Sequence, residues 1–412
     1  MSHPPPPPAS LLRRRGGADA GRVGMVELFF DLVFVFAVTQ LSHTLLQDLS
    51  GRGALQVGLL LLGVWWVWIF NVWVTNWLDP ERVAVRLSLL VLMLAGLLLS
   101  ASLPQAFADK GLSFAAAYVF MQVGRALFFL WAVRGERLAL RRNFQRILAW
   151  LTLAAPFWIA GALAPAEARL GWWALALAIE VVSPALYFWV PGLGRSSAAD
   201  WDVDGGHMAE RCALFVIIAL GESLLVTGAT FAQAAWDAAA GAAFAAAFVG
   251  SVAMWWLYFD KGERAGHHRI TSTADPGRQA RVAYTYLHLP IVAGIIVGAV
   301  GDELVLAHPA HAAPAGIAAI IGGPALYLAG VGAFKWVSNE RPLPPLSHLV
   351  GLVLLALLCL PAFGHLLSAL AIAAATSATL VLVAAWEQLS LRSPRGAGHG
   401  HRPPHSPTPR SG

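Results

Sequence analysis

Long apolar runs dominate this sequence and constrain its fold more than any other feature. A helix needs about 20 mostly apolar residues to cross the hydrocarbon core of a bilayer. Runs of this kind, bounded by charged residues, prolines or glycines, lie near residues 26–46, 54–75, 83–103, 112–132, 144–164, 171–190, 211–231, 241–259, 282–300, 315–334, 346–365 and 367–386. They predict an all-α integral membrane protein with about twelve transmembrane helices, within a range of ten to thirteen.

Composition and charge support a membrane protein. Hydrophobic residues make up 58% of the chain and charged residues 12%, a balance that a water-soluble core cannot absorb. The net charge of +5 would suit a nucleic-acid partner. However, the basic residues lie in short segments between apolar runs, as in cytoplasmic loops, so we expect a lipid bilayer and no nucleic acid as partner.

The distribution of Lys and Arg predicts the orientation. With the N-terminus in the cytoplasm, 24 of the 28 basic residues fall on the inner side. Only Arg52, Lys110 and Arg169 fall in outer loops, and Arg125 falls within a span. Because positive charge collects in cytoplasmic loops, the sequence predicts a multi-pass protein of the cytoplasmic membrane with both termini inside.

The chain divides into two tails and two membrane units. Residues 1–24 and 391–412 are rich in Pro, Gly, Ser and Arg and predict disordered cytoplasmic tails. The units are residues 25–206 and 207–390, with six spans each. Short matches link residues 25–27 to 208–210, 65–66 to 255–256 and 82–84 to 281–283. Since six is even, they predict two parallel six-helix repeats.

The first span carries two carboxylates, Glu27 and Asp31. Their i,i+4 spacing places both on one helix face, and charged groups within a span are candidates for a functional site. One interpretation is a carboxylate pair that faces a polar interior. The other is that Glu27 lies at the cytoplasmic interface while Asp31 pairs with one basic residue and sets helix packing.

Two later spans also carry candidate groups. Glu222 follows Gly221 and lies near the expected membrane midplane. Tyr284 and His288 share one face of the ninth span, and Pro290 predicts a kink beside them. A titratable imidazole there predicts a gate or proton site. The alternatives are a packing role for Glu222 and a hydrogen-bonded histidine within the bundle.

Arg125 and Glu180 lie in the fourth and sixth spans. A charge at that depth needs an opposite charge or several hydrogen-bonding partners. The two residues could pair with each other, which would be structural. Alternatively, Arg125 could pair with Asp31 or Glu222 and belong to the site.

Motifs of soluble enzymes are absent from the sequence. There is no phosphate-binding glycine-rich loop with lysine, no His-Glu-x-x-His and no nucleophile elbow. The two cysteines have no metal-ligand spacing. We therefore expect no enzyme activity, no cofactor and no metal.

Three segments carry a family resemblance: residues 27–35 (ELFFDLVFV), 219–223 (ALGES) and 284–290 (YTYLHLP). In this order they resemble the bacterial low-temperature-requirement protein A (LtrA) family over about residues 25–390. The resemblance implies a multi-spanning membrane protein named for growth in the cold, with no settled substrate. Cys212 departs from an aromatic residue associated with that position.

A more distant likeness is to an organellar potassium-channel family with two six-helix repeats. That family carries a Phe and an Asp near the start of the first helix of each repeat. Here Phe30 and Asp31 form such a pair only in the first unit, because Leu214 stands near the corresponding place in the second.

The leading functional hypothesis is a transporter or ion-conducting protein for an unknown small solute or ion. In it, Asp31, Glu222 and His288 converge on one cavity. One alternative is a structural or stress-adaptation membrane protein whose buried charges fix helix packing. The other is an intramembrane enzyme with His288 and Glu222 as acid and base. The sequence leaves the oligomeric state open.

Overall fold

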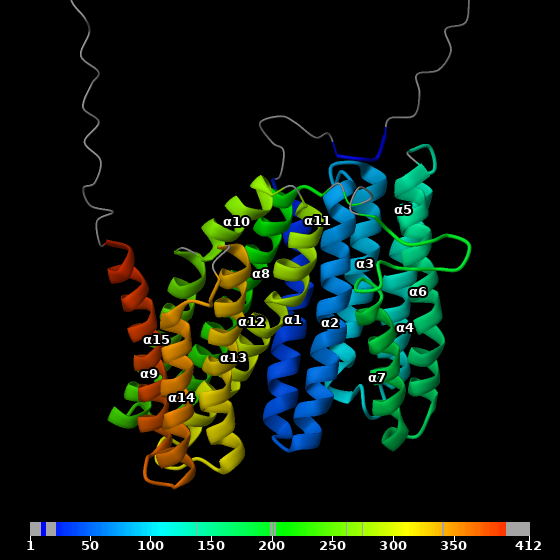
Figure 1. Ribbon diagram of the computed structural model, residues 1–412. Coiled ribbons are helices and arrows are strands. Elements are labelled where there is room, and N and C mark those ends of the chain that lie inside the picture. The colour runs from blue at the N-terminus through cyan, green and yellow to red at the C-terminus, as the bar shows by residue number, and fades with distance from the viewer. Residues whose placement is uncertain are drawn as a thin grey trace, which may run out of the picture.

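The computed structural model describes residues 10–13, 22–136, 138–197, 201, 203–260, 262–273, 275–339 and 342–392, and within them all regular structure is helical. Long helices lie side by side in one elongated bundle (Figure 1). They are α1 (Met25–Gln47), α2 (Gly51–Trp77), α3 (Val83–Ser102), η1 (Leu103–Gln105), α4 (Gly111–Val119), η2 (Phe120–Gly124), α5 (Arg125–Ala132), α6 (Leu138–Leu163), α7 (Ala166–Val182), α8 (Gly205–Gln233), α9 (Ala238–Phe259), α10 (Gly262–Ser272), α11 (Pro276–Gln279), η4 (Ala280–Tyr286), α12 (His288–Ala307), α13 (Pro314–Ser338), α14 (Leu346–Phe363) and α15 (Ala369–Arg392).

The prediction of about twelve transmembrane helices is confirmed. Eleven helical segments of the described chain are long and apolar enough to cross a membrane. The fourth combines α4, η2 and α5, and the eighth combines α11, η4 and α12. The remaining predicted span corresponds to α7, which has 17 residues and is therefore about 26 Å long.

The predicted sixth span, residues 171–190, is wrong at its C-terminal end. α7 stops at Val182, two residues before Pro184, which cannot continue a helix. The backbone then enters the left-handed region at Tyr187 (φ 52°) and Phe188 (φ 49°). The apolar residues after α7 instead line a cavity of about 130 Å³ with α2, α6 and η4.

α1 and α8 run in the same direction. Glu27 contacts Arg211 near the start of both helices, and Thr39 contacts Glu222 further along both. Hereafter the near end of the bundle is where α1 begins, and the far end is where α1 terminates. Figure 1 shows that α15 finishes at the near end as well. The first and last helices thus have their outer ends on one side, as an even number of crossings requires.

Corresponding helices pair alike in the two predicted units. In both, contacts join the first helix to the second and third, the third to the fourth, the fourth to the fifth, the fifth to the sixth, and the second to the sixth. The order in the first unit is α1, α2, α3, α4, α6, α7, and in the second α8, α9, α12, α13, α14, α15. The repeat itself stays a prediction, which superposition of the units would test.

α12 and α13 pack closely because glycines line their contact. A Cβ atom on Gly323 would lie 2.4 Å from the backbone nitrogen of Gly298, and one on Gly294 would lie 2.4 Å from that of Tyr327. No side chain fits at such distances. Small residues at these positions allow the two backbones to approach.

Part of the predicted N-terminal tail is ordered. Residues 10–13 lie along the end of α2, where Leu12 pairs with Leu78 in an isolated bridge and the Arg13 N–H donates to the Trp77 carbonyl at 2.8 Å. The predicted disorder of residues 1–9, 14–21 and 393–412 concerns positions outside the described residues. Arg13 is thereby brought to the near ends of α1 and α8.

Candidate functional site

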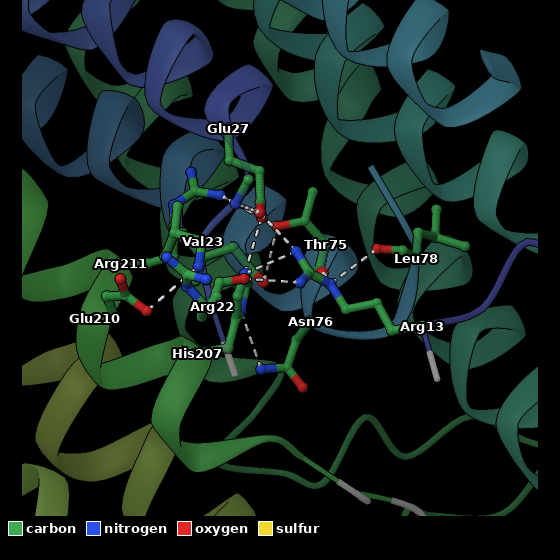
Figure 2. Close-up of polar contacts among 12 residues, drawn as sticks. Arg13, Arg22, Val23, Glu27, Thr75, Asn76, Leu78, His207, Glu210 and Arg211 are labelled. Carbon is green, nitrogen blue, oxygen red and sulfur yellow. Dashed lines mark hydrogen bonds and ion pairs between the residues drawn. The ribbon is translucent and has the colours of Figure 1, made fainter. Parts of the chain in front are cut away.

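The near ends of α1, α2 and α8 hold a charge network that includes Arg13, Glu27, His207 and Arg211 (Figure 2). Asp31 completes it, and all members except the half-buried Arg13 are buried. Arg211 bridges both carboxylates. Its Nη1 lies 2.9 Å from Glu27 Oε1, and its Nη2 lies 2.6 Å from Asp31 Oδ1. The predicted shared face of Glu27 and Asp31 is what allows one guanidinium to reach both.

Local structure places Glu27 at the start of α1. It is the third residue of the helix, and its Oε2 accepts a hydrogen bond from the Gly24 N–H at 2.8 Å, which caps the helix. The same oxygen pairs with Arg13 Nη2 at 2.5 Å. Glu27 is fully buried within the protein, and its position at the cytoplasmic interface of the membrane stays a prediction.

His207 is held as a neutral imidazole. Asn76 Oδ1 accepts a hydrogen bond from the Asp204 N–H at 2.8 Å, which fixes the orientation of the Asn76 side-chain amide. In this orientation, Asn76 Nδ2 donates to His207 Nδ1 at 3.3 Å. The ring proton therefore lies on Nε2, which donates to Glu27 Oε1 at 2.9 Å. With two guanidiniums, two carboxylates and a neutral histidine, the network carries no net charge.

The network joins α1 and α2 to α8. Asp204 caps α8 by accepting a hydrogen bond from the His207 N–H at 3.0 Å, so the helix begins at Gly205. The first turns of α8 therefore lie between α1 and α2. On the Asp31 side, Trp68 Nε1 of α2 donates to Oδ1 at 2.7 Å. Removing one member of such a buried pair typically costs about 3–5 kcal/mol, because the other member keeps a buried charge without a partner, so the side chains of α1 and α8 depend on each other.

The far ends of α1, α8 and α12 enclose an open cavity of about 600 Å³, which we call the vestibule. Glu222 lies in its wall and accepts a hydrogen bond from the Thr39 hydroxyl. Its other polar lining residues are Thr39, His43, Thr230, Gln233 and Glu303. The vestibule and the charge network therefore lie at opposite ends of the same α1–α8 interface.

His288 lies in a separate aromatic cluster. Its Nδ1 donates to the Ala283 carbonyl at 2.8 Å, so its Nε2 accepts from the Tyr258 hydroxyl at 2.7 Å. Tyr284 stacks on the imidazole with ring centroids 5.1 Å apart, and Phe334 packs edge-on. All ring positions of His288 are enclosed, which agrees with the hydrogen-bonded alternative.

Glu180 and Arg125 belong to a third buried cluster in the first unit. Glu180 accepts from Tyr118 at 2.8 Å, Gln122 at 2.8 Å and Trp158 at 2.9 Å. Arg125 donates to the Gln122 side-chain oxygen and to the Val67 carbonyl. Gln122 thus bridges the two charges, and within the described residues they form no direct ion pair.

The structure joins some of the predicted site residues and separates others. Glu27 lies beside Asp31, and Tyr284 beside His288, whereas Glu222 lies in the vestibule. Glu222 follows Arg211 by eleven residues on α8, about 16 Å along the axis. Asp31, Glu222 and His288 therefore do not share one cavity, and Glu222 and His288 form no acid–base pair.

Arg13, His207 and Arg211 are members of the network that the sequence did not identify as site residues. Arg211 was assigned to a cytoplasmic loop because the seventh span was expected to begin there, but α8 begins at Gly205. Asp204, a favoured N-cap residue, is the signal for the earlier start. No local signal identifies Arg13, which precedes its partner Glu27 in a non-helical segment.

Two comparisons with known proteins found sequences similar to this chain. The family model described as bacterial low temperature requirement A protein (LtrA) matches residues 22–385. An uncharacterized protein of Rhizobium meliloti (strain 1021) is 42% identical over 377 residues, which cover 91% of each chain. No solved structure matches.

Proposed function

The chain belongs to the bacterial low-temperature-requirement A (LtrA) family, and on that premise we propose that it moves small cations across the cytoplasmic membrane. The observation that supports this proposal most strongly is the vestibule. It lies at the far end and carries the carboxylates of Glu222 and Glu303. Acidic groups in a cavity with low-dielectric walls concentrate cations.

The α1–α8 interface has the asymmetry of one state in an alternating-access cycle. It is hollow at the far end, where the vestibule lies, and closed at the near end by the neutral charge network. Transporters built from two units expose a site between them first on one side and then on the other. In this proposal the ion pairs of Arg211 form the closed near-end gate.

The proposed orientation places the near end in the cytoplasm. The described near-end connections carry Arg134, Arg264 and Arg269, and positive charge favours the inner side. The vestibule would then open to the outside.

Flux measurements in proteoliposomes test the proposal. Purified protein is reconstituted, and uptake of sodium, potassium and protons is followed with ion-selective dyes. We expect the double variant Glu222→Gln with Glu303→Gln to lower cation flux about tenfold, because the vestibule loses its charge. Glu167→Gln is the matched control, since Glu167 is an exposed carboxylate at the start of α7, also at the far end.

Two outcomes would contradict cation transport: wild-type protein that moves none of the three ions, and a double variant that moves them at the wild-type rate. The first outcome would favour the structural alternative. Its support is that Asp31 and His288 are each enclosed by their own partners.

A further inference from the structure

A second, smaller cavity lies between α8, α9, α12, α13 and α15. Its volume is about 20 Å³, enough for one water molecule or an ion of similar size. Five side chains with oxygen atoms line it: Ser223, Ser251, Asp302, Thr376 and Ser377. We call it the hydroxyl cavity.

Asp302 is a charged residue in the wall of the hydroxyl cavity, and nothing described compensates its charge. It lies on α12 within the membrane region, and its carboxylate forms no hydrogen bond or ion pair with any described residue. An isolated carboxylate at that depth is costly unless something compensates its charge. The described part of the cavity wall supplies no positive group.

The surrounding oxygens are available as ligands. Ser223 and Ser251 are 6% and 7% exposed, and their hydroxyls form no hydrogen bond with a described residue. The hydroxyls of Thr376 and Ser377 donate to the carbonyls of Ala373 and Ala246 at 2.8 and 2.9 Å, which leaves their oxygen lone pairs free.

α13 contributes an irregularity at the same place. Pro324 lies inside this helix and has no N–H, so it cannot donate to the carbonyl of Ile320 one turn earlier. Both residues line the cavity. A helix carbonyl that lacks its donor is a common cation ligand in membrane transporters.

From this set of oxygens we propose that the hydroxyl cavity binds one monovalent cation of sodium size, with Asp302 as the charged ligand. Hard cations bind oxygen ligands. One carboxylate with several neutral oxygens balances a single positive charge, whereas calcium sites take 6–8 ligands and usually several carboxylates. The volume of one water molecule leaves no room for a hydrated ion.

The vestibule provides the route to this site. Glu222 and Ser223 are neighbours on α8, and Asp302 and Glu303 are neighbours on α12. In each pair the glutamate lines the vestibule and the other residue lines the hydroxyl cavity. The two spaces therefore lie beside adjacent residues of α8 and of α12. Any role of the hydroxyl cavity in transport rests on the proposed cation transport. The proposal that this cavity binds sodium does not depend on it.

Equilibrium binding of radioactive sodium to the purified full-length protein in detergent tests the proposal. We expect one sodium ion per chain in wild-type protein and none in Asp302→Asn. Ser251→Ala should weaken sodium binding about tenfold, the effect of one lost ligand interaction. Glu167→Gln is the matched control, because Glu167 is an exposed carboxylate at the start of α7 that lines neither cavity, and we expect its affinity to stay within about threefold of wild type.

Thermal unfolding of the same samples in sodium or choline chloride gives a second readout. A ligand that binds the folded state raises the melting temperature, so sodium should stabilise wild type and Glu167→Gln but not Asp302→Asn. Absence of sodium binding to wild type, or equal binding by Asp302→Asn, would overturn the proposal. If the protein binds sodium but shows no cation flux, the proposed transport is refuted and the sodium site stands. If it shows cation flux but binds no sodium, the sodium site is refuted and the proposed transport stands.

Discussion

Two tyrosines contact His288, and they differ in what their hydroxyls do. Tyr258 donates to the imidazole Nε2 at 2.7 Å, whereas the Tyr284 hydroxyl is buried and has no hydrogen-bond partner in the structure. We expect Tyr258→Phe to lower the free energy of unfolding by about 1–3 kcal/mol, because it leaves a buried acceptor without a donor. Tyr284→Phe removes no hydrogen bond and should be neutral or stabilising.

Thermal unfolding of both variants in one detergent measures this difference, and each serves as the control for the other. Equal loss of stability in the two variants would show that packing of the rings, and not the hydrogen bond to His288, holds the cluster together.

At the level of single residues, the sequence identified several costly groups but not their partners, and it missed Asp302, which lies within α12 beyond the end of the expected ninth span. Asp31 was predictable because a charge inside an apolar run is expensive. Its partner Arg211 was not, since the two positions are 180 residues apart and no local pattern links them. Gln122 was also missed as the bridge between Arg125 and Glu180, because a neutral amide does not stand out in an apolar run.

Among the elements, the contact of α12 with α13 makes a sharp prediction. Gly323→Ala would place a Cβ atom 2.4 Å from a backbone nitrogen of α12, so the helices must separate. We expect a loss of about 1–3 kcal/mol in unfolding free energy, as for other overpacked contacts. Gly322→Ala is the control, because a Cβ atom there meets nothing within 4 Å, and the change should stabilise the helix by about 0.5–1 kcal/mol.

Melting temperatures of the two alanine variants test the close contact. If Gly323→Ala were as stable as Gly322→Ala, α12 and α13 would not be in backbone contact in the membrane.

The positions of the helices were largely predictable because the bilayer demands apolar length. The exception is the end of α7, where apolar residues such as Phe188 continue after the helix has stopped. Apolar composition indicates that a segment avoids water, but it does not distinguish a helix facing lipid from a loop that lines a cavity. The breaking signal, Pro184, lay within the expected span.

For the molecule as a whole, the testable property is its orientation. Single cysteines are introduced at Glu263, in the near-end α10, and at His311, between α12 and α13 at the far end, after Cys212 and Cys359 are replaced by alanine. A membrane-impermeant maleimide added to intact cells should label position 311 and leave position 263 unlabelled until the membrane is permeabilised.

The reverse pattern would place the vestibule on the cytoplasmic side. The two positions control for each other, because each must react once both sides are open.

The separation in sequence between Asp31 and Arg211 also has a consequence for biosynthesis. α1 leaves the ribosome long before α8, and at about 5–20 residues per second the 180 residues between these partners take about 10–40 seconds to make. Throughout that time Arg13 is already available to pair with Glu27, but Asp31 has no guanidinium group to pair with because Arg211 has not yet been made. The first helix therefore enters the bilayer with an unmatched carboxylate, and a nascent chain truncated before α8 would expose that defect to membrane proteases.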